Sequence, residues 1–183
     1  MKKITSLLVV IALIANFTTQ LSAQTKQTIT TTAGAVLIAP IALTQVTPLH
    51  FGTITLTTAA AGTCVLSTVG VRTFTGGLGA SSLAPVATNA TYTLTGKKAA
   101  AIIVTFGLPS ITIITGAGSA PTDKMTVSNF LVRFTGETTD SFTDIIDATT
   151  GAGGFSVGAT LTSIASQNAG VYTGTFSVSV DYQ

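Results

Sequence analysis

The last residues of the chain alternate strictly between apolar and polar side chains. From Thr175 onward the apolar positions are Phe176, Val178, Val180 and Tyr182, with Ser177, Ser179 and Asp181 between them. A period of two residues is typical of a β-strand with one buried and one solvated face. The pattern therefore predicts a terminal strand whose even-numbered side chains face a core. Such a strand needs a neighbour at each edge, and the source of the second neighbour is the main question that the sequence raises.

Short segments of the same kind recur through the rest of the chain. Runs rich in Thr, Val and Ile are separated by Gly, Pro, Asn and Asp, which predicts an all-β sandwich or barrel. We expect strands within residues 45–56, 63–66, 69–74, 91–95, 101–106, 111–114, 125–134 and 155–161. The apolar parity changes at Gly52, which predicts a bulge or bend there, and changes again between Val127 and Phe130. One short helical turn is expected near residues 163–167.

The start of the chain has the pattern of a secretory signal peptide. Lys2 and Lys3 precede an apolar run over residues 7–15, and small residues end at Ala23. The run is too short to span a bilayer, so we predict a signal peptide over residues 1–23 and export from the cytoplasm. The remaining 160 residues suit a single domain.

Composition narrows the function further. Removal of the signal peptide leaves six basic and six acidic residues, so nucleic-acid binding has no electrostatic support. Charged residues make up only 8 % of the chain and the mean hydropathy is +0.63, which is unusual for a monomer that must stay dispersed. A surface of Thr, Ser, Ala and Gly favours a protein that packs against copies of itself.

The chemically versatile residues do not form a recognisable site. Cys64 is the only cysteine and lies in an apolar strand pattern, so we expect it to be buried, with intermolecular pairing as the alternative. His50 is the only histidine and is expected on a solvated strand face. Asp140, Asp144 and Asp147 lack the spacing of a calcium loop. The sequence therefore predicts no enzyme, no cofactor and no metal site.

Three segments together resemble a known family. They are residues 49–54, 157–161 and 170–182, in this order and behind a signal peptide. The arrangement resembles the domain-of-unknown-function 4402 family of exported bacterial proteins, and more broadly the spore-coat-U and chaperone–usher pilins. The resemblance implies an incomplete immunoglobulin-like, pilin-like sandwich over residues 40–183, whose missing strand is donated by a neighbouring subunit. It also implies a periplasmic assembly chaperone and an outer-membrane usher as partners, and a final location in a surface filament.

The segment before Pro40 is the candidate donor strand. Residues 24–39 precede the first clear strand of the domain, and the proline would end pairing between the two. In one register the side chains that enter the neighbour's groove are Ile29, Thr31, Ala33, Ala35 and Leu37; in the other they are Gly34, Val36 and Ile38. The predicted assembly interface is Ile29, Ala33, Ala35 and Leu37 of one copy against Phe176, Val178, Val180 and Tyr182 of the next.

Two other functions fit the same sequence. The first is a monomeric exported binding module with a complete sandwich, such as an adhesin or a carbohydrate-binding domain. The second is a small outer-membrane β-barrel, which the alternation and the low charge support but the missing aromatic girdles oppose, since the chain has no Trp and three Tyr.

Overall fold

The structure is a computed structural model that describes residues 26–183, so the predicted signal peptide lies outside the described residues. The chain divides into two units, residues 1–36 and residues 37–183. Every strand belongs to the second unit. Residues 26–40 are exposed and form no strand.

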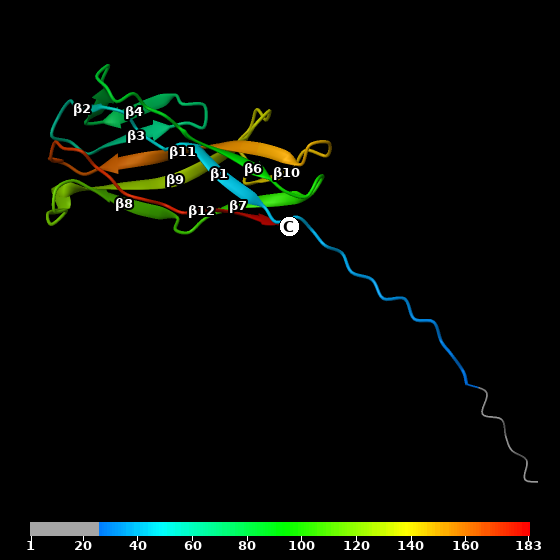
Figure 1. Cartoon of the computed structure of the whole chain (residues 1–183). Helices are drawn as coiled ribbons and strands as arrows, with labels where there is room; N and C mark the ends of the chain where they lie inside the picture. The colour runs from blue at the N-terminus through cyan, green and yellow to red at the C-terminus, as the bar shows by residue number, and fades with distance from the viewer. Residues whose placement is uncertain (1–25) are drawn as a thin grey trace, which may run out of the picture. The chain divides into compact units, whose positions relative to one another are not determined.

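The described residues form twelve β-strands and one short 3₁₀ turn (Figure 1). The strands are β1 (Ala42–Thr47), β2 (Ile54–Leu56), β3 (Gly62–Leu66), β4 (Arg72–Gly76), β5 (Leu78–Ala80), β6 (Ala90–Thr95), β7 (Ala101–Phe106), β8 (Ser110–Ile114), β9 (Lys124–Phe134), β10 (Thr143–Ile145), β11 (Ala152–Ser163) and β12 (Val178–Tyr182). The 3₁₀ turn, η1, spans Pro121–Asp123. The all-β architecture predicted from the sequence is confirmed.

The long strand β11 organises the larger sheet. Along one edge it pairs with β9, and along the other it pairs first with β6 and then with β3. Strand β1 continues the sheet beyond β6, β4 continues it beyond β3, and β8 continues it beyond β9. Strand β11 can serve three neighbours because its buried side chains, including Phe155, Val157 and Leu161, follow a continuous two-residue period over twelve residues.

A smaller sheet has the order β10-β7-β12, and β2 pairs with β5 in a separate ribbon. The terminal strand β12 is therefore an edge strand, paired antiparallel with β7 and with no other strand of the part described. Figure 1 shows this sheet below the β6, β9 and β11 region of the larger one. The two layers form a β-sandwich.

Aromatic side chains fill the space between the layers. Tyr92 and Phe155 stack with their ring centroids 4.9 Å apart, and Phe134 lies 5.7 Å from Phe155. Phe106 of the smaller sheet stacks on Phe130 of the larger sheet at 4.7 Å. Contacts of this kind add about 0.5–1.5 kcal/mol each beyond the burial of apolar area. They join the two sheets into one core.

The changes in apolar parity mark real irregularities in the backbone. Gly52 has φ = +76° and lies between β1 and β2, so the predicted bend at this glycine is confirmed. The second parity change falls on Asn129 of β9, with φ = +50°, where pairing with β11 slips by one residue. The slip is a β-bulge that lets Val127 and Phe130 both face the core.

The helical turn expected near residues 163–167 is wrong. Ser163 ends β11, and Gln167 accepts a hydrogen bond from the backbone N–H of Ile164 at 3.1 Å. The Gln167 amide also donates to the carbonyl of Lys124 at 3.1 Å. These contacts fix the segment as an irregular turn against the start of β9. Local sequence could not show them, because the partner lies some forty residues earlier.

Cys64 is fully buried in β3, as predicted. Burial raises the pKa of its thiol to about 11 from an ordinary value of 9.0, and the nearby Arg72 charge opposes this shift only in part. The thiol therefore stays protonated in the folded protein at pH values where the unfolded chain would ionise. The environment favours a packing role over a reactive one.

We expect Cys64→Ala to cost about 1–2 kcal/mol of unfolding free energy at pH 7, because only a small apolar group is removed. The native thiol also makes the wild-type protein lose stability between pH 9 and about 11, since in that window the unfolded chain releases a proton that the folded chain retains. Urea unfolding at pH 8 and pH 10 should therefore show the gap between wild type and variant narrowing. A gap that widens with pH would contradict the buried, neutral thiol.

Candidate functional site

The outer edge of β12 is the most prominent unused feature of the fold. Gly107 N–H donates to Ser177 O at 3.2 Å and Gln183 N–H donates to Ala101 O at 3.0 Å, so the odd-numbered residues carry the hydrogen bonds to β7. In an antiparallel pair the intervening residues point their N–H and C=O groups the other way. The backbones of Val178, Val180 and Tyr182 thus face an edge at which the described part of the chain supplies no strand.

The side chains on this edge match the predicted alternation. Phe176, Val178, Val180 and Tyr182 are half-buried and pack against the core, whereas Ser177, Ser179 and Asp181 are exposed. The ring of Phe176 lies 5.0 Å from that of Phe130. The residues with unpaired backbone are therefore the ones with incompletely covered apolar side chains, which is the condition of a strand that lacks a neighbour.

The first strand of the domain presents a second open edge. Gly96 N–H donates to Gly151 O at 2.9 Å, which assigns the even-numbered residues of β6 to β11 and the odd-numbered ones to β1. Their partners on β1 are Ala42 and Thr44. Leu43 then points its backbone outward, and its half-buried side chain packs against the core.

Two hollows flank the terminal segment, one near each end. The first, about 280 Å³ in volume, lies between Phe176 and the residues that join β7 to β8, and we call it the Phe176 hollow. The second, about 380 Å³, lies between the end of β12 and the start of β1, and we call it the Tyr182 hollow. The Phe176 hollow is lined by Leu108, Ile111, Thr175, Phe176 and Ser177. The Tyr182 hollow is lined by Ile38, Ala39, Pro40, Ile41, Val180, Asp181 and Tyr182.

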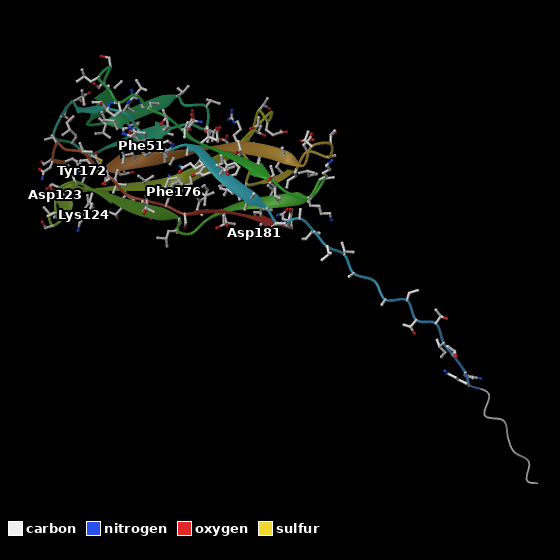
Figure 2. All side chains as sticks on the ribbon, in the orientation of Figure 1. Phe51, Asp123, Lys124, Tyr172, Phe176 and Asp181 are labelled. Atoms are coloured by element: carbon white, nitrogen blue, oxygen red, sulfur yellow. The ribbon has the colours of Figure 1, made fainter. Side chains whose placement is uncertain are left out.

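Tyr182 ties the two open strands together. Its hydroxyl donates to the carbonyl of Ala39 at 2.8 Å and accepts a hydrogen bond from the backbone N–H of Lys97 at 2.6 Å. The root of the N-terminal segment is therefore held beside the last residues of the chain. Figure 1 shows the C-terminus next to the start of β1, and Figure 2 places Asp181 at this end of the domain, with Tyr172 and Asp123 at the opposite end.

We expect Tyr182→Phe to lower the unfolding free energy by about 1–2 kcal/mol, because one variant removes two hydrogen bonds and leaves the ring in place. Thermal unfolding followed by circular dichroism measures the loss. The exposed Tyr172→Phe change is not a suitable control because that hydroxyl also bonds, to the carbonyl of Asn168 at 2.6 Å. Ser179→Ala, on the exposed face of the same strand, is suitable. A midpoint equal to that of Ser179→Ala would contradict the role of the hydroxyl.

This edge lies within a recognised protein family. The family described as "Domain of unknown function (DUF4402)" matches residues 41–182. The chain belongs to this family. No curated protein and no solved structure gave a significant match. The match covers β1 to β12 and stops where the N-terminal segment begins, so the open edges belong to the DUF4402 domain itself.

The predicted donor residues lie outside the DUF4402 match. Ile29, Ala33, Ala35 and Leu37 are all exposed, and none belongs to a strand. Among the described residues the structure therefore gives these side chains no packing role. The other half of the predicted interface, on β12, is placed at an edge that lacks a neighbour.

The polar residues of the DUF4402 domain serve local structure. His50 accepts a hydrogen bond from Gly52 N–H at 2.8 Å, and Asp140 pairs with Arg133 at 2.8 Å. Hydrogen bonds from Thr150 and Thr149 hold the pKa of Asp147 below its usual range. No group of three or more His, Cys, Asp or Glu side chains in residues 26–183 is placed to hold a metal ion. None of the helical structure described is long enough to cross a membrane.

Sequence reasoning missed the wall opposite β12. Ile41 and Leu43 are half-buried beside the open edge, and Leu108 and Ile111 line the Phe176 hollow. The alternation of Ile41 and Leu43 was visible in the sequence, but Pro40 made this stretch look like the end of the extension rather than the start of a strand. Leu108 gave no signal, because it lies in a turn between Gly107 and Pro109.

Proposed function

We propose that this protein is a structural subunit of a bacterial surface filament, assembled by β-strand addition. In this proposal the sandwich is an incomplete immunoglobulin-like, pilin-like domain, and residues 28–38 of one copy complete the domain of the next. The observation that carries the proposal is the outer edge of β12, where unpaired backbone coincides with half-buried apolar side chains. Strand addition is an established mode of recognition that satisfies both deficits at once.

The N-terminal segment has the properties that a donor requires. Residues 26–36 are exposed, and the model-wide backbone hydrogen bonds include none from this segment. Residues 27–39 contain no proline, so each can donate a main-chain hydrogen bond. Exposed Ile29 and Leu37 would be a solubility cost in a free monomer and gain a purpose once buried in a neighbour.

The charge pattern supports assembly of like copies. With few charges in the chain and equal basic and acidic residues after the predicted signal peptide, copies repel one another weakly. The predicted signal peptide supports export through the periplasm, where a chaperone could cover the open edge and an usher could pass subunits to the surface. Exposed edges of this kind are otherwise an aggregation hazard.

The proposal is tested with the chain lacking residues 1–23. We expect this protein to form a ladder of multimers that resists mild heating in detergent on an unreduced gel, and filaments in negative-stain images. Cys64→Ala is the matched control, because a ladder of disulfide-linked copies would disappear in that variant and a ladder of inserted strands would remain. A single monomer band from both proteins would contradict the proposal and favour the monomeric binding module.

A further inference from the structure

The structure distinguishes the two donor registers that the sequence leaves open. The argument rests on the proposed function and concerns which side chains enter and from which end. Three observations carry it: the two hollows along the terminal segment, the engagement of Ile38 in its own domain, and the position of Ala39 beside Tyr182.

The first observation concerns shape. The terminal segment has a hollow near each end, and half-buried Val178 lies between the two hollows. A matching strand needs a large side chain toward each end and small side chains in the middle. The odd-numbered set has this form, because Ile29 and Leu37 enclose the smaller residues at 31, 33 and 35. The even-numbered set has its large residues, Val36 and Ile38, at one end only.

The second observation removes Ile38 from the even-numbered set. Ile38 lines the Tyr182 hollow of its own domain and is 52 % exposed. Leu37 is 97 % exposed and Ile29 is 84 % exposed, so both are free to enter another copy. Val36, at 86 %, is then the one large side chain that the even-numbered set could donate.

The third observation sets the polarity. The N-terminal segment leaves its own domain at the Tyr182 end of the groove, since Ala39 O is bonded to the Tyr182 hydroxyl. A donor running parallel to β12 would bring its own domain to that same end, where each copy could enter the other and close a dimer. A donor running antiparallel to β12 brings its domain to the Phe176 end, which leaves the acceptor's segment free for a third copy. Only the second, heterologous arrangement continues into a filament.

We propose that the donor strand runs antiparallel to β12, with Leu37 in the Phe176 hollow and Ile29 toward the Tyr182 hollow of the next copy. The odd-numbered side chains then face the core beside Val178 and Val180, because residues directly opposite in an antiparallel pair share a face. Antiparallel pairing is also slightly the more stable per residue.

The parity is tested by Leu37→Asp against Val36→Asp in the chain lacking residues 1–23. Both positions are exposed in the single chain, so neither variant should alter folding, and circular dichroism checks this. Leu37→Asp is expected to reduce the multimer ladder at least about tenfold, since a charge replaces a buried leucine at each junction. Val36→Asp should retain the ladder. The reverse result would overturn the assigned register and leave strand addition intact.

The polarity is tested by cross-linking two differently tagged chains that both carry Cys64→Ala. One chain carries Leu108→Cys in the wall of the Phe176 hollow, and the other carries Leu37→Cys or Ile29→Cys. A short bis-maleimide should join Leu37→Cys, and not Ile29→Cys, to Leu108→Cys. Joining through Ile29→Cys, or a ladder without any joining through Leu37→Cys, would overturn the polarity. Loss of the ladder from the wild-type chain itself would instead overturn the proposed function.

Discussion

A domain cut to residues 40–183 is expected to gain substantial thermal stability when a synthetic peptide of residues 28–39 is added. The cut removes the proposed donor and leaves the outer edge of β12 uncovered in every copy. A peptide that pairs with Val178, Val180 and Tyr182 supplies their missing hydrogen bonds, each worth about 0.5–1.5 kcal/mol. It also covers the half-buried side chains that now contact water.

The size of the effect follows from linkage. A peptide present at 100 times its Kd stabilises the folded state by about 2.7 kcal/mol. For a domain of this length that free energy raises Tm by roughly 5–11 °C. Scanning calorimetry at several peptide concentrations measures the shift, which should grow with the logarithm of the concentration. The truncated domain alone should unfold at low temperature or aggregate, because an apolar open edge invites non-specific pairing.

Two controls make the experiment specific. A peptide with aspartate in place of the residue equivalent to Leu37 should give a much smaller shift, whereas a peptide with aspartate at the Val36 position should act like the parent. Both carry the same added charge, so a non-specific effect of charge would make them equal. A truncated domain that is a stable monomer and ignores all three peptides would rule out strand addition through this segment.

The terminal strand shows how much local pattern can predict. The alternation of Phe176, Val178, Val180 and Tyr182 identified the buried face correctly, because side-chain direction in a strand depends on parity alone. The strand itself is shorter than expected and begins at Val178. Upstream, Thr173 pairs with Ile114 of β8, so the chain must pass from the larger sheet to the smaller one before β12 begins. That crossing depends on distant strands and has no local signal.

The central role of β11 could not be predicted for a related reason. Residues 155–161 read as an ordinary strand, but the structure pairs β11 with β3, β6 and β9, which lie far apart in sequence. Pairing partners are selected by the fit of whole faces, not by neighbouring residues. The open edges are likewise a property of topology: the sequence predicted a strand in need of a second neighbour, and only the sheet order shows which edge of it is free.

Aspartate is expected to have opposite consequences at Val178 and Ser179, although the two residues are adjacent. Val178 is half-buried against the core and pairs with Phe106, whereas Ser179 is exposed and pairs with Thr105. Val178→Asp loses roughly 1.5–3 kcal/mol of apolar burial and adds the cost of drawing a carboxylate from water. Against a typical total of about 5–15 kcal/mol, that loss leaves little or no stable domain. Ser179→Asp should remain within about 0.5 kcal/mol of wild type.

The same pair separates folding from assembly when Val178→Ala is added. Alanine keeps the site apolar, so the domain should fold with a reduced unfolding free energy, and urea titrations order the three variants. The multimer ladder should be absent in Val178→Asp, weakened in Val178→Ala and intact in Ser179→Asp, because Ser179 points away from the proposed groove. Acidification below pH 4 should return part of the stability of Val178→Asp, since a carboxyl group drawn from water is more stable in its neutral form. Equal tolerance of aspartate at 178 and 179 would mean that the face of β12 on which the whole interface depends is not buried.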